Sequence, residues 1–347
     1  QIPEKLLTWY DKNARVLPWR EDPRPYRVWV SEIMLQQTRV EAVKPYFERF
    51  LKALPTVADL AQAPEEQLLK LWEGLGYYNR VRNLQRGARA VMAEHGGVIP
   101  ASFEALKKLP GIGDYTAGAI GSIAFQIPVP AVDGNVLRVI SRVLYRRDNI
   151  LDAKVKRRIE GEIKEILPER TGDFNQSLME LGATVCLPNG APKCNECPLQ
   201  ELCRAHLVGD EESLPVKTKA KKRKIEQRTV FLLVCDGKIA LRKRPEKGLL
   251  AGLWELPSQE GMLGCAEAGK LLQTWGVRTL GELQKQTDAK HIFSHVEWHM
   301  TCWYVEAALD PDADVKELIW VSRKELDQDV ALPAAFKTYR KVIEKIL

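Results

Sequence analysis

The sequence predicts a multi-domain chain with an all-α first half and an α+β second half. Three observations support this prediction. Up to about residue 206, apolar residues recur at helical spacing, as around Leu68, Leu69 and Trp72. A basic stretch without apolar periodicity follows, and short β-prone runs begin after it. We therefore expect a helical domain at 1–206, an extended basic linker at 207–228 and an α+β domain at 229–347.

The composition is that of an ordinary folded protein. The chain has 347 residues, of which 45% are hydrophobic, so it can bury more than one core. The formal net charge is +6, from 52 basic and 46 acidic residues, and Lys217–Lys224 alone carries six positive charges and no acid. The rest of the chain is formally neutral, so net charge is a weak argument for nucleic acid binding.

The sequence argues against a secreted or membrane protein. The seven cysteines form no disulfide scaffold, because four of them crowd between Cys186 and Cys203. The first residues lack the basic and apolar pattern of a signal peptide. The longest uncharged stretch, 115–132, contains Gly118 and Pro128, which predicts a buried helix followed by a break. We expect a cytoplasmic protein that does not enter a membrane.

A helix-hairpin-helix motif is predicted near residue 110. Ser102–Leu109 has the pattern of a helix, Pro110–Gly113 that of a tight turn, and Asp114 that of the cap of a second helix. Gly111 and Gly113 let the backbone turn sharply and bring amide groups, at a positive helix N-terminus, close to an anion such as a DNA phosphate. An ordinary turn between two helices is the alternative.

The same glycines imitate a dinucleotide-binding fingerprint, because Asp133 lies twenty residues beyond Gly113. Thr116, however, replaces the third glycine, and a helix precedes the turn where the fingerprint needs a strand. We reject this interpretation.

Four cysteines have the spacing of a metal site. They stand as Cys186-x7-Cys194-x2-Cys197-x5-Cys203, in a run with Pro188 and Gly190 that leaves the thiolates free to converge. Four thiolates suit either Zn²⁺ or an iron-sulfur cluster, and the spacing does not decide between them. Four free cysteines that happen to cluster are the alternative.

The positions of two acids, Glu32 and Asp133, can be explained without a catalytic role. Glu32 follows Ser31 at what looks like the start of a helix, where the helix dipole favours a carboxylate. Asp133 precedes Gly134 and Asn135 between an apolar segment and the next helix, the position of an N-cap. Neither acid is distinctive in isolation.

The second half begins as a sheet. Thr229–Cys235 and Lys238–Lys243 are short β-prone runs, joined by Asp236-Gly237, a hairpin turn signature. A long strand is predicted at His291–Tyr304, followed by another at Glu317–Val321 and a terminal helix. These elements predict an α+β domain.

Taken together, five segments resemble the MutY family of adenine DNA glycosylases: SEIMLQQT (31–38), GLGYY (74–78), LPGIGDYTAGAI (109–120), VDGNV (132–136) and the four-cysteine loop. The part after the linker resembles the Nudix-like domain by which this family recognises 8-oxoguanine, so the resemblance covers essentially the whole chain. One departure is visible. The family usually has six residues between the first two cysteines, whereas Cys186 and Cys194 enclose seven.

The resemblance implies an all-α helix-hairpin-helix glycosylase domain with an iron-sulfur subdomain, followed by an α+β Nudix-like domain. A six-helix barrel would bear the hairpin, and the N-terminal residues with about 131–206 would form the subdomain. One 4Fe-4S cluster would be held in the loop 186–203 by Cys186, Cys194, Cys197 and Cys203. The implied activity is that of a monomeric, monofunctional glycosylase on nucleoid DNA. It would act on double-stranded DNA that carries adenine mispaired with 8-oxoguanine or guanine.

The resemblance also assigns roles to individual residues. Glu32 would donate a proton and later activate water, Asp133 would stabilise or transiently bond the cationic sugar, and Tyr115 and Asn135 would orient these groups. The adenine pocket would contain Trp19, Arg20 and Gln176. The duplex would be wedged or contacted by Gln37, Thr38, Leu75, Gly76 and Tyr77, in addition to the hairpin glycines Gly111 and Gly113. The lesion-sensing loop would be Phe293, Ser294 and His295, with Ser294 bonded to 8-oxoguanine.

The chemistry explains why two carboxylates are needed. Adenine leaves only when its ring is protonated, and the remaining sugar acquires oxocarbenium character that an anion stabilises. The donor must hold its proton near neutral pH, so we expect Glu32 to be more desolvated than Asp133.

Two alternatives belong to other classes. An endonuclease III-like glycosylase-lyase acting on oxidised pyrimidines would carry a lysine at the position of Tyr115 to form a Schiff base, and none stands there. We therefore expect base removal without efficient strand cleavage. A non-catalytic DNA-binding protein would need no paired acids. Nucleotide hydrolysis in the C-terminal domain is not expected, because Lys270, Gln273 and Thr274 replace the metal-binding glutamates of a Nudix box within Gly252–Gly276.

Overall fold

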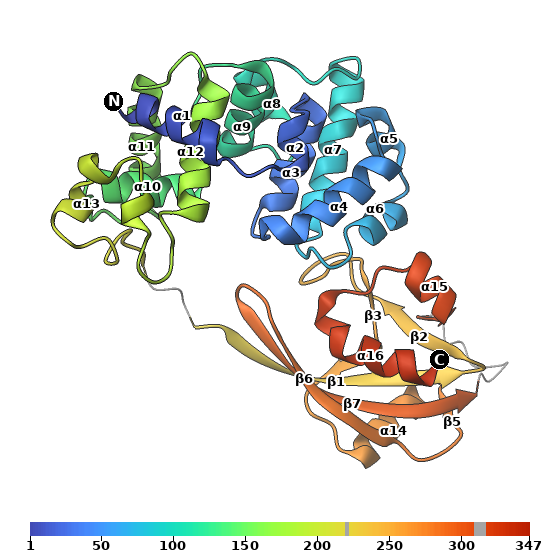
Figure 1. Ribbon diagram of the computed structural model, residues 1–347. Helices are drawn as coiled ribbons and strands as arrows, with labels where there is room; N and C mark the ends of the chain where they lie inside the picture. Colours follow the sequence, from blue (N-terminus) through green and yellow to red (C-terminus); the bar gives the residue numbers. More distant parts are fainter. Residues whose placement is uncertain (219–221, 309–316) are drawn as a thin grey trace. The chain divides into compact units, whose positions relative to one another are not determined.

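The computed structural model describes residues 1–218, 222–308 and 317–347 (Figure 1). The chain forms two compact units. Unit 1 comprises Gln1–Ala63 and Asn79–Lys219, and unit 2 comprises Pro64–Tyr78 and Ala220–Leu347. No sequence pattern indicates that Pro64–Tyr78 groups with the C-terminal residues. The grouping arises from polar contacts that only folding makes, such as those of Lys70 with Leu326 and Val330.

The regular elements of unit 1, within its described residues, are all helices. Its helices are α1 (Ile2–Asn13), α2 (Pro18–Glu21), α3 (Pro25–Leu35), α4 (Val40–Ala53), α5 (Val57–Gln62), α7 (Asn79–Glu94), α8 (Phe103–Lys108), α9 (Asp114–Phe125), α10 (Gly134–Val143), α11 (Ala153–Glu165), α12 (Thr171–Thr184) and α13 (Arg204–Leu207), with short 3₁₀ turns at Cys194–Glu196 and Gln200–Leu202. Among the helices that the structure describes, none combines the length and apolar character needed to cross a bilayer.

One core of unit 1 forms around α10, in agreement with the helical spacing of its apolar residues. Val136, Val139 and Ile140 lie in this core with Leu6 of α1 and Phe174 of α12. The N-terminal helix therefore packs with the region that leads to the cysteine loop. This is the composition that the resemblance implies for the iron-sulfur subdomain.

The helix-hairpin-helix motif is formed by α8, the turn at 109–113 and α9. Gly111 has φ 78°, in the left-handed region, and a Cβ there would lie 2.7 Å from Cβ of Asn83. This position therefore requires glycine for both its backbone conformation and its surroundings. The cap of α9 is Gly113 rather than Asp114, which is instead the first residue of the helix and pairs with Lys107 over 2.7 Å.

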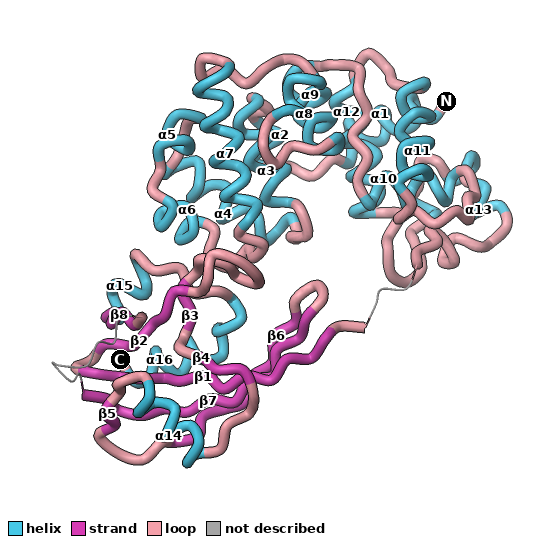
Figure 2. Tube along the Cα trace, turned by 180° about the vertical axis from the view of Figure 1, so that it is seen from behind, coloured by secondary structure: helices cyan, strands magenta, loops and turns pink. Residues whose placement is uncertain are grey.

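Unit 2 is built on a mixed sheet with helices on both faces (Figure 2). Its elements are α6 (Glu65–Leu71), β1 (Lys224–Cys235), β2 (Lys238–Lys243), β3 (Trp254–Glu255), β4 (Ser258–Glu260), α14 (Cys265–Thr274), β5 (Arg278–Thr279), β6 (Gln284–Ile292), β7 (Val296–Ala308), β8 (Leu318–Ser322), α15 (Arg323–Gln328) and α16 (Lys337–Ile346), with a 3₁₀ turn at Ala334–Phe336. The described strands run in the order β3-β2-β1-β7-β5, while β4, β6 and β8 pair with β1, β7 and β2 respectively.

The alternation of side chains along β1 explains why the sheet is covered on both faces. Val230 and Leu232 belong to one core with Tyr339 of α16, whereas Phe231 belongs to a second core with Leu272 of α14. Successive side chains of a strand point to opposite faces, so a continuous apolar run needs a layer on each.

The predicted hairpin is confirmed. β1 and β2 pair antiparallel with Cys235 opposite Lys238, and the turn residues Asp236 and Gly237 both have positive φ. β1 nevertheless begins at Lys224, inside the stretch predicted as linker, because its first residues pair in parallel with β7. Residues 219–221 of that linker lie outside the described part of the chain.

The prediction of one long strand at His291–Tyr304 is wrong. β6 ends at Ile292, β7 begins at Val296, and the two strands pair antiparallel with Ile292 opposite Glu297. Phe293, Ser294 and His295 therefore form the turn between them. The amide of Phe293 closes this turn by bonding to the carbonyl of Val296 over 2.8 Å.

Candidate active site

Glu32 lies in the interior of α3 and not at a helix start, so the helix-dipole explanation of this residue is wrong. α3 begins at Pro25, a full two turns earlier, and Glu32 is buried with 6% of its surface exposed. A buried carboxylate among apolar neighbours is costly unless it is bonded or protonated. Glu32 accepts a hydrogen bond, and its pKa is raised.

The bond comes from Tyr115 on α9, whose hydroxyl donates to Oε2 of Glu32 over 2.5 Å. Burial raises the pKa of Glu32 to about 7, and the charge of Asp133 adds to the rise, while the Tyr115 hydrogen bond and Arg20 act in the opposite direction. Burial likewise raises the pKa of Tyr115, so its hydroxyl keeps its proton. Glu32 can therefore carry a proton near neutral pH.

Asp133 is the N-cap of α10, as the sequence predicts. Its Oδ1 accepts the backbone amide of Val136 over 2.8 Å, and its Oδ2 accepts the side-chain amide of Asn135 over 2.8 Å. Burial raises the pKa of Asp133, while these two hydrogen bonds lower it. Asp133 is half-buried and Glu32 is buried, so the expectation that Glu32 is the more desolvated acid is confirmed.

A chain of hydrogen bonds leads from Asp133 toward the cysteine loop. Asn135 accepts from the guanidinium of Arg138 over 2.9 Å, and Arg138 in turn donates to the carbonyl of Cys186 over 2.8 Å. Arg138 also donates to the carbonyl of Gly182 over 2.8 Å. These contacts orient Asn135, and through it the Asp133 carboxylate.

Two helical glycines let the helices around the acids approach one another. A Cβ on Gly118 of α9 would lie 2.2 Å from the carbonyl oxygen of Pro130, and a Cβ on Gly182 of α12 would lie 2.6 Å from Cβ of Asn135. Both contacts are shorter than any side chain permits, so these backbone approaches require glycine.

Both acids line one cavity of about 790 Å³ in unit 1. The volume is within the range of small-molecule sites, about 300–1,000 Å³. Eleven of the predicted catalytic, adenine-pocket and DNA-contacting residues line this cavity: Trp19, Arg20, Glu32, Gln37, Thr38, Gly111, Gly113, Tyr115, Asp133, Asn135 and Gln176. The two acids are a hundred residues apart in the chain, and the fold brings them to the same space.

Sequence reasoning missed a buried ion-pair cluster in the cavity wall. Glu180 of α12 accepts from Arg15 over 2.6 Å and from Arg20 over 2.8 Å, and its side chain is fully buried. Burial raises the pKa of Glu180, but the bonds from the two arginines outweigh that effect and hold the pKa below its usual value. Glu180 stands four residues after Gln176, one turn along the same helix face, and this spacing is the signal that could have identified it.

The four cysteines line a second cavity of unit 1, together with Val139, Leu181 and Arg142. The buried Arg142 donates to Sγ of Cys186 over 3.2 Å and to the carbonyl of Leu187 over 2.9 Å.

In unit 2 the predicted lesion-sensing residues lie in the β6–β7 turn, and Leu75, Gly76 and Tyr77 lie in the turn that follows α6. The Tyr77 hydroxyl and Oγ of Ser294 share a hydrogen bond of 2.7 Å. Phe293 packs edge-on against Trp298, with ring centroids 4.9 Å apart. Two segments that are 217 residues apart therefore meet through one pair of hydroxyls.

A helix-hairpin-helix beside a cavity with paired acids, followed by a sheet domain with helices on both faces, defines a base excision DNA glycosylase. Comparison with known families agrees. Residues 30–165 match the HhH-GPD superfamily of base excision DNA repair proteins, and residues 229–342 match the NUDIX domain. Among solved structures, a thermostable thymine-DNA glycosylase superposes with a TM-score of 0.55 and 29% identity, over 59% of this chain and 95% of the other.

Relatives that match nearly the whole of this chain show the family. The adenine DNA glycosylase of Rattus norvegicus is 36% identical over 98% of this chain and 77% of its own length. The adenine DNA glycosylase of Buchnera aphidicola subsp. Baizongia pistaciae is 32% identical over 99% of this chain and 96% of its own length. The chain belongs to the adenine DNA glycosylase family. It is a monofunctional N-glycosyl hydrolase that removes adenine from DNA in base excision repair.

Proposed function

We propose that the adenine removed is one mispaired with 8-oxoguanine in double-stranded DNA, and that Glu32 and Asp133 perform the excision. The observation that carries this proposal is the single cavity lined by both acids. A stacked adenine is out of reach of any side chain, so the nucleotide must leave the helix and enter such a space. Unpairing and unstacking a base costs a few kcal/mol, and this cost is smaller for a base that is already mispaired.

Glu32 acts as the proton donor. A donor works best when its pKa is close to the working pH, and burial raises the pKa of Glu32 to about 7. Its proton passes to a ring nitrogen of adenine, which makes the base a better leaving group. The resulting carboxylate then accepts a proton from the water that attacks the sugar.

Asp133 stabilises the positive charge that develops on the sugar as the glycosidic bond breaks. Its carboxylate is held in place by the amide of Val136 and by Asn135, so it needs no rearrangement when the charge appears. Tyr115 orients Glu32 in the same way through its hydrogen bond.

The rest of the cavity wall suits a purine nucleotide. We assign Trp19, Arg20 and Gln176 to the adenine pocket. The Arg20 guanidinium is fixed by Glu180 and by the carbonyl of Arg15 over 3.1 Å, which pre-organises it. Gln37, Thr38, Gly111 and Gly113 contact the duplex in this proposal. The amides of a helix-hairpin-helix turn would bind DNA phosphate.

Residues of unit 2 recognise the 8-oxoguanine opposite the adenine. Phe293, Ser294 and His295 occupy a tight turn, where side chains are presented to a ligand, and Ser294 and His295 are exposed. Tyr77, which is 49% exposed, acts beside Leu75 and Gly76 as the wedge against the lesion strand. Because one chain supplies the acids and this turn, we propose that it acts as a monomer.

We propose that Cys186, Cys194, Cys197 and Cys203 hold one 4Fe-4S cluster. All four cysteines line one cavity, and four thiolates are the ligand set of such a cluster. The resemblance of the loop to that of the family favours a cluster over Zn²⁺. When bound, the cluster cross-links the loop through four iron-thiolate bonds.

The test is base release from duplexes that differ only in the base opposite adenine. The full-length chain should release adenine opposite 8-oxoguanine faster than opposite guanine, and opposite thymine least. Equal rates for the three duplexes would contradict the proposed substrate. Equal rates for the wild-type chain and Glu32→Gln would contradict the proposed donor.

A further inference from the structure

The turn that carries Tyr77 has an unusual backbone. α6 ends at Leu71, and the next residues include Gly74 with φ 102°, Gly76 with φ 70° and Tyr77 with φ 47°. A tyrosine in the left-handed region is strained and persists only where its surroundings fix it. The indole of the buried Trp72 contributes, because its Nε1 donates to the carbonyl of Gly76 over 3.1 Å.

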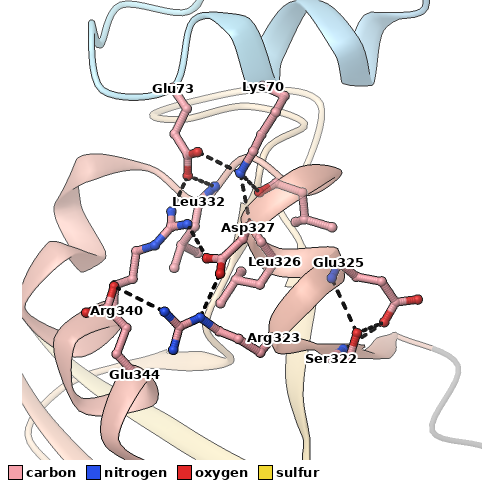
Figure 3. A network of polar contacts seen from close by, with 11 residues as sticks. Lys70, Glu73, Ser322, Arg323, Glu325, Leu326, Asp327, Leu332, Arg340 and Glu344 are labelled. Carbon is pink, nitrogen blue, oxygen red and sulfur yellow. Dashed lines mark hydrogen bonds and ion pairs between the residues drawn. The ribbon is translucent and has the colours of Figure 1, made fainter. Parts of the chain in front are cut away.

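Lys70, at the end of α6, is bonded to the last turn of α15 and to the residues that follow it (Figure 3). Its ammonium donates to the carbonyls of Leu326 and Val330 over 2.9 and 3.0 Å, and to Oε2 of Glu73 over 2.8 Å. The last carbonyls of a helix lack partners within the helix and attract a cation. Lys70 meets this need at the end of α15.

Glu73 makes the second set of contacts. Its Oε1 accepts the backbone amide of Leu332 over 2.9 Å and the guanidinium of Arg340 over 2.6 Å. Arg340 also donates to Asp327 over 3.0 Å. The Lys70 and Glu73 side chains are only 17% and 16% exposed, so water screens these charged contacts little.

The same turn is held at its other end by the bond between Tyr77 and Ser294. Lys70 and Glu73 therefore attach one end to α15 and α16, and Tyr77 attaches the other end to the β6–β7 turn. Each attachment is polar and directional, so together they fix the three residues between Glu73 and Tyr77 within unit 2.

We propose that Lys70 and Glu73 are positioning residues for lesion specificity. They act with Arg340 to hold the Gly74–Tyr77 turn in register with Ser294. This inference rests on the proposed function, since it concerns the same lesion-reading residues. In this proposal neither Lys70 nor Glu73 touches the substrate. They act through Tyr77, and loosening them should weaken discrimination between 8-oxoguanine and guanine rather than the chemical step.

The test compares Glu73→Gln with the matched control Glu344→Gln in the full-length chain. Glu344 lies on α16 and pairs with Arg323 over 4.0 Å, without a contact to Lys70 or Glu73 (Figure 3). Single-turnover excision should show that Glu73→Gln lowers the preference for 8-oxoguanine over guanine about fivefold, a typical coupling effect. Excision opposite guanine should stay within about twofold of wild type, which a misfolded variant would not achieve.

Hydrogen exchange gives a readout that does not depend on activity. In Glu73→Gln the amides of residues 74–78 should exchange about fivefold faster, while Glu344→Gln leaves them unchanged. Arg340→Gln should act like Glu73→Gln, and the double variant should be no worse than either single one, because both remove the same ion pair. Unchanged exchange at 74–78, or faster exchange with unchanged preference, would overturn the inference.

Failure of the proposed function has a different signature. If the wild-type chain showed no preference for 8-oxoguanine, the proposed substrate would be wrong. The proposed role of Lys70 and Glu73 in lesion specificity would then be wrong as well. The exchange rates would still report whether Lys70 and Glu73 hold the turn.

Discussion

The Tyr115 hydroxyl donates to Oε2 of Glu32 over 2.5 Å, so the buried carboxylate of the cavity has one identifiable hydrogen-bond donor. Burial raises the pKa of Glu32 to about 7, and this bond limits the rise because it stabilises the ionised form. The two residues come from α3 and α9, helices that pack directly against each other. The contact between Glu32 and Tyr115 therefore links the packing of two helices to the pKa of Glu32, which can be measured.

Glu32→Gln should abolish adenine release. Glutamine is close in shape and can still accept the Tyr115 bond, but it has no proton of suitable acidity to give. General acid catalysis typically contributes about 10²–10⁴ in rate, so single-turnover excision should fall at least about a hundredfold while duplex affinity stays unchanged. Glu41→Gln, at an exposed position on α4, is the matched control and should behave as wild type. Normal turnover by Glu32→Gln would remove this residue from the mechanism.

Tyr115→Phe should shift the pH dependence of excision. The Tyr115 bond lowers the pKa of Glu32, so its removal lets burial raise that pKa further. Activity declines as pH rises through the pKa of the donor, and in Tyr115→Phe this decline should begin at higher pH. The check is a single-turnover pH profile of both forms. A profile displaced to lower pH, or not displaced, would contradict the assigned role of the bond.

Glu32 should also destabilise the protein at high pH. Its folded pKa, about 7, lies above the ordinary value of 4.5, so the unfolded chain loses this proton more readily. Stability is therefore unaffected below about pH 4.5, is lost as pH rises between the two values, and stays reduced above about pH 7. The full effect is on the order of 3 kcal/mol.

Glu32→Gln should consequently raise Tm by several degrees at pH 8 and much less at pH 5. Thermal unfolding of both forms at the two pH values measures the difference. A gain that was equal at both pH values would indicate that packing, and not ionisation, caused it.

Ser294→Ala should reduce the preference for 8-oxoguanine. A hydrogen bond that is made only with the lesion is worth about 1.4 kcal/mol, so the rate ratio between 8-oxoguanine and guanine should fall about tenfold. Tyr77→Phe keeps the wedge and Ser294 but removes their mutual bond, and it should produce a smaller loss of preference. If both duplexes slowed equally in Ser294→Ala, the residue would support the fold without reading the lesion.

Cys194→Ser should remove the metal. The wild-type chain should be brown and contain about four iron atoms, and the variant should lose both the colour and most of the iron. Cys265→Ser, at an exposed cysteine of α14, should keep them. Zinc in the wild-type chain, with no visible absorption, would contradict the proposed cluster.

Interactions between residues close together in the sequence were sufficient to predict much of the fold. Asp236-Gly237 indicated a hairpin because two residues of positive φ are needed there, and the structure contains that hairpin. Asp133 could be recognised as a cap because a short acid before a helix bonds its own backbone. The turn at 293–295 was missed because apolar alternation continues through it, and only the antiparallel pairing of β6 with β7 reveals it.

What the sequence by itself determined is therefore the set of residues and their local conformations, since helix caps, hairpin turns and the cysteine spacing depend on near neighbours. Only the tertiary structure decided the environment of Glu32. Its burial inside α3, its bond to Tyr115 and its meeting with Asp133 in one cavity involve residues that are about a hundred positions apart. A pKa depends on solvent and charge in three dimensions, so the position of Glu32 in a helix could not reveal its raised pKa, and the sequence assigned it as the donor only through the resemblance of SEIMLQQT to the family.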